Sequence, residues 1–396
     1  MICWLTEICH LQLTIEPFSA PFPTFYKGIS PRFSSESFLL LSLPHFRLFG
    51  ESAKSCQHFK NQMEKNVLVL TCLLIVVTIF KNAVLSCSPD ELVLVQMKGK
   101  FQAYALGCYL RARYGGFITS NPTEVEVLSA SKKHCVLSSQ SLTTALYAPD
   151  SNWEIVQDFP WQPIFAQYGN DTDKYLSQPF CPFADEETQR LSSEQMKNME
   201  NYEDLIYYWK ENSGWDFKDL EDIETLYNTV RAEAKYGLNI PSWVQNYWNY
   251  MQYLHDLSFA LKLKTKDQKR FRGGPLLEVT LDKMKKKASG ELEKTKVIHY
   301  TTLGNNIAAF LSTMDVWNGL EPDSCATVLI ELYKSEDSHF VRYLYLNSTT
   351  PEREPQQLHL LTIPGCTEYC PLDYILEYTH DRIPQNWEEE CLNSLK

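Results

Sequence analysis

The order in which helical and strand patterns alternate limits the fold of this chain more than any single residue does. In residues 97–114 apolar side chains recur at three-to-four spacing, and Gly115-Gly116 then ends the predicted helix. A strand pattern follows over residues 124–129, and a second helical pattern over residues 138–147. Helix, strand and helix in such close succession predict an α/β layer fold.

A change of composition divides the chain. Between residues 170 and 270 charged and aromatic side chains crowd together, Val and Ile become scarce, and the pattern is helical throughout. Gly273-Gly274-Pro275 then predicts a break in the helical pattern, and a further helix is expected to begin at Leu276. We therefore predict an α/β core built from residues 87–169 and 271–396, with residues 170–270 inserted as a helical cap.

Strand patterns return in the second half of the core. Val297 to Thr302 reads as a strand and Asn306 to Met314 as a helix. Two runs rich in β-branched and aromatic residues, 326–333 and 340–346, are separated by a polar turn. These two runs are expected to pair as a hairpin.

The strongest targeting signal begins at Met63. A short charged start precedes fourteen uncharged residues, Val67 to Phe80, and small residues follow up to Cys87. This is the pattern of a secretory signal peptide, and the run is too short for a comfortable membrane span of about 20 residues. We assign residues 63–86 to a signal peptide and expect a secreted, extracellular protein with no membrane attachment after cleavage. Residues 1–62 are interpreted as a mis-assigned leader, with a genuine but unstructured leader as the alternative.

Cysteine usage fits an extracellular protein. Eight cysteines follow the predicted signal, and an even number favours disulfide bonds, although their spacing leaves the pairing open. Cys366 and Cys370 are not accompanied by a second Cys/His pair at zinc spacing, so we expect no metal site. The triplets at Asn170 and Asn347 are N-glycosylation acceptors in a secretory lumen, although each alone also arises by chance.

The charge balance excludes one class of partner. The formal net charge is -12, whereas a protein that binds the phosphate backbone of nucleic acid normally carries a basic face. The lysines between residues 283 and 296 fit a solvated helix face better than an anion site. We expect no nucleic-acid partner and no cofactor.

Several segments, taken together and in order, resemble the histidine acid phosphatases, and among them the insect venom acid phosphatases. The matching segments between about residues 87 and 391 include Lys98-Gly99-Lys100, Leu110-Arg111-Ala112-Arg113-Tyr114, Trp161-Gln162-Pro163-Ile164, Ile240-Pro241-Ser242-Trp243, Gly273-Gly274-Pro275-Leu276-Leu277, Pro364-Gly365-Cys366, Cys370-Pro371-Leu372 and Glu390-Cys391. The resemblance implies an α/β fold with a mostly parallel sheet flanked by helices, a histidine phosphatase-like core with an inserted helical cap. It also implies disulfides between Cys366 and Cys370 and between Cys181 and Cys391. Cys325 matches a further family cysteine, but the position of its family partner falls near Asn228.

The resemblance also implies a reaction whose residues this chain lacks. In the family a neutral histidine attacks phosphorus, arginines hold the phosphoryl oxygens, and an acid protonates the leaving group. The nucleophile belongs to an Arg-His-Gly-x-Arg motif on the first strand, and no such motif occurs in residues 1–396. Leu128 stands where the family has a phosphate-binding arginine. Leu303 and Gly304 stand where it has a His-Asp or His-Glu pair, and neither side chain can donate a proton.

Two other histidine-containing stretches are candidate substitutes for the missing family residues. Lys132-Lys133-His134 lies close to the lost arginine position, so a weak anion or phosphate ligand is conceivable there, with an exposed turn as the default. His380-Asp381-Arg382 imitates the missing pair, but its place near the C-terminus favours a surface loop.

The leading hypothesis is a secreted histidine acid phosphatase-like protein that is catalytically inactive and acts by binding. The alternative is an acid phosphatase that hydrolyses phosphate monoesters through a phosphohistidine, with the nucleophile strand missing from the gene model. A third hypothesis is a non-enzymatic subunit, because the resemblance implies a homodimer or a dimer with an active paralogue.

Overall fold

The computed structural model describes residues 2–7, 89–199, 202–235, 237–347 and 350–393. The predicted signal peptide therefore lies outside the described residues. Among the helices that are described, none combines the length and the apolar character needed to cross a membrane.

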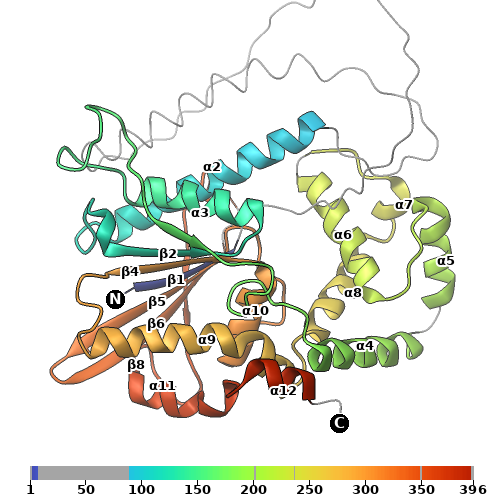
Figure 1. Ribbon diagram of the computed structural model, residues 1–396. Helices are drawn as coiled ribbons and strands as arrows, with labels where there is room; N and C mark the ends of the chain where they lie inside the picture. The colour runs from blue at the N-terminus through green and yellow to red at the C-terminus, as the bar shows by residue number, and fades with distance from the viewer. Residues whose placement is uncertain (1, 8–88, 200–201, 236, 348–349, 394–396) are drawn as a thin grey trace, which may run out of the picture. The chain divides into compact units, whose positions relative to one another are not determined.

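A mixed sheet forms the centre of the fold, in the strand order β3-β2-β4-β1-β5-β6-β7 with β8 beside β6 (Figure 1). The strands are β1 (Ile2–Glu7), β2 (Val125–Ser129), β3 (Ala166–Tyr168), β4 (Val297–Thr302), β5 (Thr327–Ser335), β6 (Ser338–Leu346), β7 (Leu358–Leu361) and β8 (Cys370–Pro371). β3, β2, β4 and β1 run parallel, and β5 to β8 continue the sheet with antiparallel pairs. The predicted hairpin is confirmed as β5 and β6.

Helices cover both faces of the sheet. The core helices are α2 (Pro89–Arg113), α3 (Lys133–Leu146), α9 (Lys266–Ala288), α10 (Gly304–Thr313), α11 (Leu372–Tyr378) and α12 (Trp387–Asn393), with short 3-10 helices η1 (Pro122–Glu124) and η2 (His380–Arg382). Val297 packs in one hydrophobic cluster with residues of α2 and α3. The next residue of β4, Ile298, packs in a second cluster with residues of α9, α10 and α11. Because successive side chains of a strand point to opposite faces, β4 joins both layers. The α/β fold class is confirmed.

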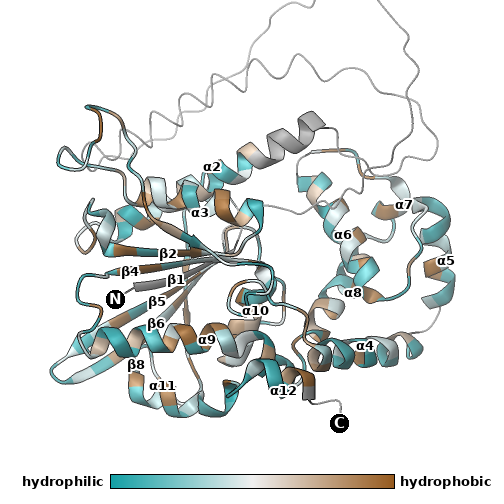
Figure 2. Cartoon of the chain, viewed as in Figure 1, coloured by the Kyte–Doolittle hydropathy of each residue, from teal (hydrophilic) through white to brown (hydrophobic). Residues whose placement is uncertain are grey.

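The inserted segment is helical, as its composition predicts. It contains α4 (Pro182–Lys197), α5 (Tyr202–Ser213), α6 (Leu220–Lys235), α7 (Ser242–Gln245) and α8 (Trp248–Leu261). Trp209, which is fully buried, lies in a separate hydrophobic cluster formed by these helices. In Figure 2 brown apolar residues are interspersed with teal polar ones along these helices, which is the pattern of helices with one buried face.

The structure corrects the predicted break at Gly273-Gly274-Pro275, because α9 continues through all three residues. A Cβ atom on Gly273 would lie 2.2 Å from Thr313 Oγ1, and one on Gly274 would lie 2.5 Å from the Arg382 carbonyl oxygen. These glycines therefore allow α9 to pack closely against neighbouring backbone. Here tertiary contact outweighs the low helix propensity of Gly and Pro.

The structure also differs from the sequence analysis at the N-terminal end of the chain. Ile2–Glu7, assigned above to a leader outside the core, forms β1, which pairs with β4 from Ile2↔Val297 to Glu7↔Thr302 and with β5 on its other side. The physical reason lies in the sheet: without β1 the facing backbone groups of β4 and β5 would lose their strand partner. A stretch of six residues carries too little periodicity to reveal this role.

Both disulfides implied by the resemblance are present. Cys181 is bonded to Cys391 and Cys366 to Cys370. Cys325 is also disulfide-bonded, although the position expected for its family partner falls near Asn228. Cys135 is free and buried.

A buried imidazole connects the cap to the core. His255 of α8 is fully buried, and its Nδ1 lies 2.9 Å from Asp256 Oδ1 while its Nε2 lies 3.1 Å from Glu321 Oε2. Glu321, in the segment between α10 and β5, also accepts a hydrogen bond of 2.6 Å from Arg231 Nη2 of α6. Ionised carboxylates only accept hydrogen bonds, so both ring nitrogens must carry hydrogen and His255 is an imidazolium ion.

The protonation of His255 makes the stability of this junction depend on pH. Burial alone lowers the pKa of His255, and the Arg231 charge acts in the same direction, but the hydrogen bonds and charges of Glu321 and Asp256 outweigh both and raise it. The pKa of Glu321 is lowered, because the His255 and Arg231 partners outweigh its burial. The other nearby charged or titratable groups are Tyr227 and Asp323.

We predict that His255→Gln destabilises the protein more at pH 5.5 than at pH 9. A raised folded-state pKa adds stability that is complete below the unfolded value of about 6.5 and is lost as pH rises through the folded value. The loss at pH 5.5 should be about 1.5–3 kcal/mol, as for a hydrogen bond to a charged group. Urea unfolding at both pH values measures it, with His359→Gln on β7 as the control. A loss independent of pH would contradict the imidazolium assignment.

A second prediction concerns β1. A chain that begins at Ser88 should be less stable than the full chain by roughly 0.5–1.5 kcal/mol for each backbone hydrogen bond lost from β4 and β5. Deletion of residues 20–60, which keeps β1 in the chain, is the control. Equal urea midpoints for the full chain and the chain from Ser88 would show that β1 contributes nothing to the sheet.

Candidate active-site edge

Three sequence-predicted positions meet at one edge of the sheet. The parallel pairing of β2 with β4 sets Leu128 opposite Tyr300. Leu303 and Gly304 follow directly after β4, as the N-cap and the first residue of α10. In α/β folds, ligands bind outside the carboxyl ends of parallel strands. The structure therefore brings the three positions together where this architecture normally holds a ligand.

The side chains at this edge are apolar. Leu128 and Leu303 both pack against the hydrophobic cluster that contains Ala130 and Phe310. Leu303 makes no side-chain hydrogen bond to the start of α10, and Gly304 is buried. The side chains at these positions supply no guanidinium, imidazole or carboxyl group.

Three polar side chains at this edge form hydrogen bonds within the protein, although Asn306 Oδ1 is buried with no partner among the described residues. Thr302 Oγ1 donates to the Leu176 carbonyl at 2.7 Å, and Asn306 Nδ2 donates to Thr302 Oγ1 at 2.6 Å. Ser129 Oγ donates to the Ala130 carbonyl at 3.0 Å. These bonds have a structural role: they hold the ends of β2 and β4 and connect β4 to the segment that contains Leu176.

One histidine on β4 was not considered in the sequence analysis. His299 is fully buried, its Nε2 lies 3.0 Å from Thr301 Oγ1, and burial lowers its pKa to about 3. It is therefore neutral at physiological pH. Its position inside the sheet keeps it away from any solvent-borne substrate, so it does not replace the missing nucleophile.

In the two other histidine-containing stretches, Lys132 and Arg382 bond within the protein. Lys132 precedes α3, and its ammonium group is paired with Asp171 at 3.1 Å. His380, Asp381 and Arg382 form η2, where Arg382 Nη1 donates to the Thr313 carbonyl at 2.7 Å. The described part of the chain also contains no group of three or more His, Cys, Asp or Glu side chains suited to a metal ion.

Three lysines of the cluster between residues 283 and 296 also bond within the protein. Lys283 is paired with Glu126, and Lys286 lies 2.8 Å from Asp282. Lys287 Nζ donates to three backbone carbonyls, including that of Leu292 at 2.8 Å. This agrees with the interpretation of the cluster as a helix face rather than an anion site.

A hollow of about 300 Å³ lies beside this edge, and we name it the edge hollow. Its lining residues come from the segment before α4, from α4, the start of α6, α8, α9 and α10: Gln178, Phe180, Asp185, Thr188, Gln189, Glu221, Phe259, Lys262, Leu263, Arg272 and Asn305. Asn305 immediately follows Gly304, and Gln178 Nε2 donates to its carbonyl at 3.2 Å. Arg272 Nη2 donates to Asp185 Oδ1 at 2.6 Å. Sequence reasoning missed these residues because helical patterns alone do not show which polar side chains share a hollow.

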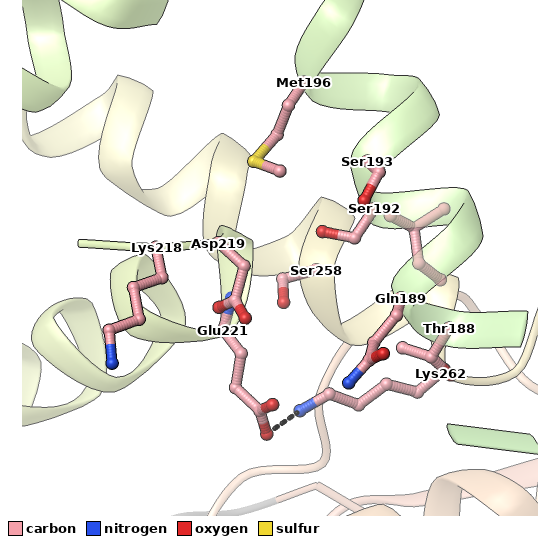
Figure 3. A pocket seen from close by; sticks show the side chains of 11 residues that line it. Thr188, Gln189, Ser192, Ser193, Met196, Lys218, Asp219, Glu221, Ser258 and Lys262 are labelled. Carbon is pink, nitrogen blue, oxygen red and sulfur yellow. Dashed lines mark hydrogen bonds and ion pairs between the residues drawn. The ribbon is translucent and has the colours of Figure 1, made fainter. Parts of the chain in front are cut away.

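A second hollow of about 220 Å³ continues into the cap, and we name it the cap hollow (Figure 3). The two hollows share the lining residues Thr188, Gln189, Glu221 and Lys262. The Lys262 ammonium group lies 2.9 Å from Glu224 Oε1 and 3.4 Å from Glu221 Oε1. Burial lowers the pKa of Lys262, but the two glutamates outweigh this effect and raise it. Lys262 is therefore charged and paired.

Comparison with known proteins gives a family from the sequence and a similar fold from solved structures. The family pattern described as histidine phosphatase superfamily (branch 2) matches residues 51–346. Prostatic acid phosphatase of Rattus norvegicus is 31% identical over 310 residues, covering 75% of this chain and 79% of the relative. Venom acid phosphatase Acph-1 of Apis mellifera is 29% identical over 301 residues, covering 74% and 76%. A Hafnia alvei phytase in complex with tartrate matches with a TM-score of 0.55 and 13% identity, covering 73% of this chain and 87% of that chain, and shows the fold alone.

Proposed function

This chain belongs to the histidine phosphatase superfamily (branch 2), and on that premise we propose that it is a secreted, catalytically inactive relative of the acid phosphatases that acts by binding. The observation that carries the proposal is the apolar edge formed by Leu128, Leu303 and Gly304. These residues stand at the carboxyl ends of β2 and β4, where the reaction of the family needs a guanidinium group and a proton donor.

The size of the expected loss follows from what these groups do. Charged donors stabilise the charge that develops on the phosphoryl oxygens, and removing one such donor typically slows a reaction by about 10²–10³. Leu128 removes the cation, Leu303 and Gly304 remove the acid, and no Arg-His-Gly-x-Arg motif supplies a nucleophile. The reaction needs all these groups in the same transition state. We therefore expect the protein to act by binding and not by turnover.

The secretory location rests on separate features. The uncharged run of Val67 to Phe80, the Cys181–Cys391 disulfide and the acceptor triplets at Asn170 and Asn347 all fit the secretory pathway. Asn170 lies at the surface, although its Oδ1 accepts hydrogen bonds from Thr172. Mass spectrometry of secreted protein should find a start near residue 87, and peptides from residues 1–62 in that material would contradict the proposal.

We predict that the purified chain hydrolyses p-nitrophenyl phosphate no faster than a buffer blank at acid pH. The reason is the absence of nucleophile, phosphate-binding arginine and proton donor from one site. The control is an active histidine acid phosphatase prepared from the same host and assayed in parallel. Turnover by this chain that survives removal of contaminating host enzyme would overturn the proposal.

A restoration series tests whether the missing family residues account for the expected lack of activity. Replacing Ile2–Glu7 and the residues that follow with a family-type strand carrying Arg-His-Gly should not restore turnover alone. Adding Leu128→Arg, Leu303→His and Gly304→Asp should be required together, because such groups act as a unit. Circular dichroism of each variant separates loss of activity from loss of fold.

One observation favours a second candidate function. β1 occupies the centre of the sheet between β4 and β5, and cleavage after the predicted signal would separate it from the rest of the chain. A secreted chain therefore needs another strand in that position. A strand encoded by an omitted exon and carrying the nucleophile would fill it, which is the case of an acid phosphatase with a damaged gene model. Sequencing the 5′ end of the transcript decides: an Arg-His-Gly run between Ser86 and Leu94 favours this candidate, and its absence removes it.

A further inference from the structure

The cap hollow presents an unusually dense set of small polar side chains. Thr188, Gln189, Ser192 and Ser193 follow one face of α4 at helical spacing, and Met196 continues this face. Figure 3 shows these side chains facing Glu221, Ser258 and Lys262 across the hollow. The wall therefore combines hydroxyl, amide and carboxylate groups over a short distance.

Several of these groups have no partner within the described residues. Ser192 is 91% buried, and its Oγ forms no hydrogen bond. The side chains of Gln189 and Ser193 make none either, while Thr188 and Ser258 bond to neighbouring protein groups. The Ser192 Oγ is covered by protein, whereas Gln189 and Ser193 are exposed, so these two side chains are the ones that can bond to a ligand in the hollow.

Three cations line the two hollows, and two of them are paired with carboxylates; for the third, Lys218 of the cap hollow, the described residues supply no ion pair. Lys262 is paired with Glu224 and Glu221, and Arg272 is paired with Asp185. A phosphate or other anion would have to compete with a carboxylate for each of these cations. Lys262 and Arg272 are therefore poor anion receptors, and a ligand without net charge fits this paired part of the lining better.

We propose that the cap hollow binds a neutral polyhydroxylated ligand, a sugar ring, as the ligand of the binding role proposed above. Each sugar hydroxyl both donates and accepts hydrogen bonds, which suits the Gln189 amide, the Ser193 hydroxyl and the free oxygen positions of Glu221. A second sugar unit extends into the edge hollow, past the lining residues that the two hollows share. There Phe180, 75% exposed, offers an apolar ring face to the C–H groups of that unit.

Titration calorimetry of the full chain with cellobiose, mannobiose and chitobiose tests the proposal, with inorganic phosphate as a separate arm. At least one disaccharide should bind, and Gln189→Leu should weaken its binding by about tenfold, the equivalent of one lost hydrogen bond. Gln189 is exposed, so this variant should fold normally. Gln195→Leu is the matched control, because Gln195 lies on the same helix and lines neither hollow.

The outcomes separate this inference from the proposed function. Binding of no disaccharide, binding of phosphate alone, or equal weakening by Gln189→Leu and Gln195→Leu would each overturn the sugar site. None of these results would restore phosphatase activity, which is decided by the p-nitrophenyl phosphate assay. Conversely, hydrolysis in that assay together with Gln189-dependent sugar binding would overturn the inactive role and leave the sugar site standing.

Discussion

The parallel pairing of β2 with β4 is the constraint on which the candidate site depends. It fixes Leu128 beside Tyr300 and carries both strands to the same edge, so that the start of α10 follows where β2 also ends. A shift of one residue would turn the side chains of β4 to the opposite faces of the sheet. Val297 and Ile298 lie in different hydrophobic clusters, so this register supplies side chains to the helix layers on both faces of the sheet.

The same edge is held together by apolar packing and by internal hydrogen bonds. Leu128 and Leu303 extend a hydrophobic cluster that already holds the strands and helices together, so the replacement residues contribute to packing. A charged arginine or a buried acid at these positions would instead need a compensating partner. The polar bonds of Thr302 and Asn306 hold the strand ends without any substrate, so neither the packing nor these bonds require an active site.

The cap is joined to the core by a different kind of interaction. Its own helices pack around Trp209, whereas His255, Glu321 and Arg231 form a buried charged network that reaches the segment between α10 and β5. Within the hollows, Lys262 and Arg272 are paired with carboxylates in the same manner. These ion pairs hold the cap and occupy Lys262 and Arg272 in the lining of the hollows.

The sequence by itself determined the fold class, the inserted helical segment, the β5–β6 hairpin and the absence of an Arg-His-Gly-x-Arg motif, because periodicity, composition and motif order are local properties. The resemblance placed Leu128, Leu303 and Gly304 in their roles, and the sheet register shows that these positions share one edge. The sequence did not determine that α9 runs through Gly273-Gly274-Pro275, that Ile2–Glu7 fills the centre of the sheet, or that Gln189 and Lys262 line the same hollow. Only the tertiary structure decided these features, because each depends on contacts between segments far apart in the chain, and such contacts leave no period or motif in the segments themselves.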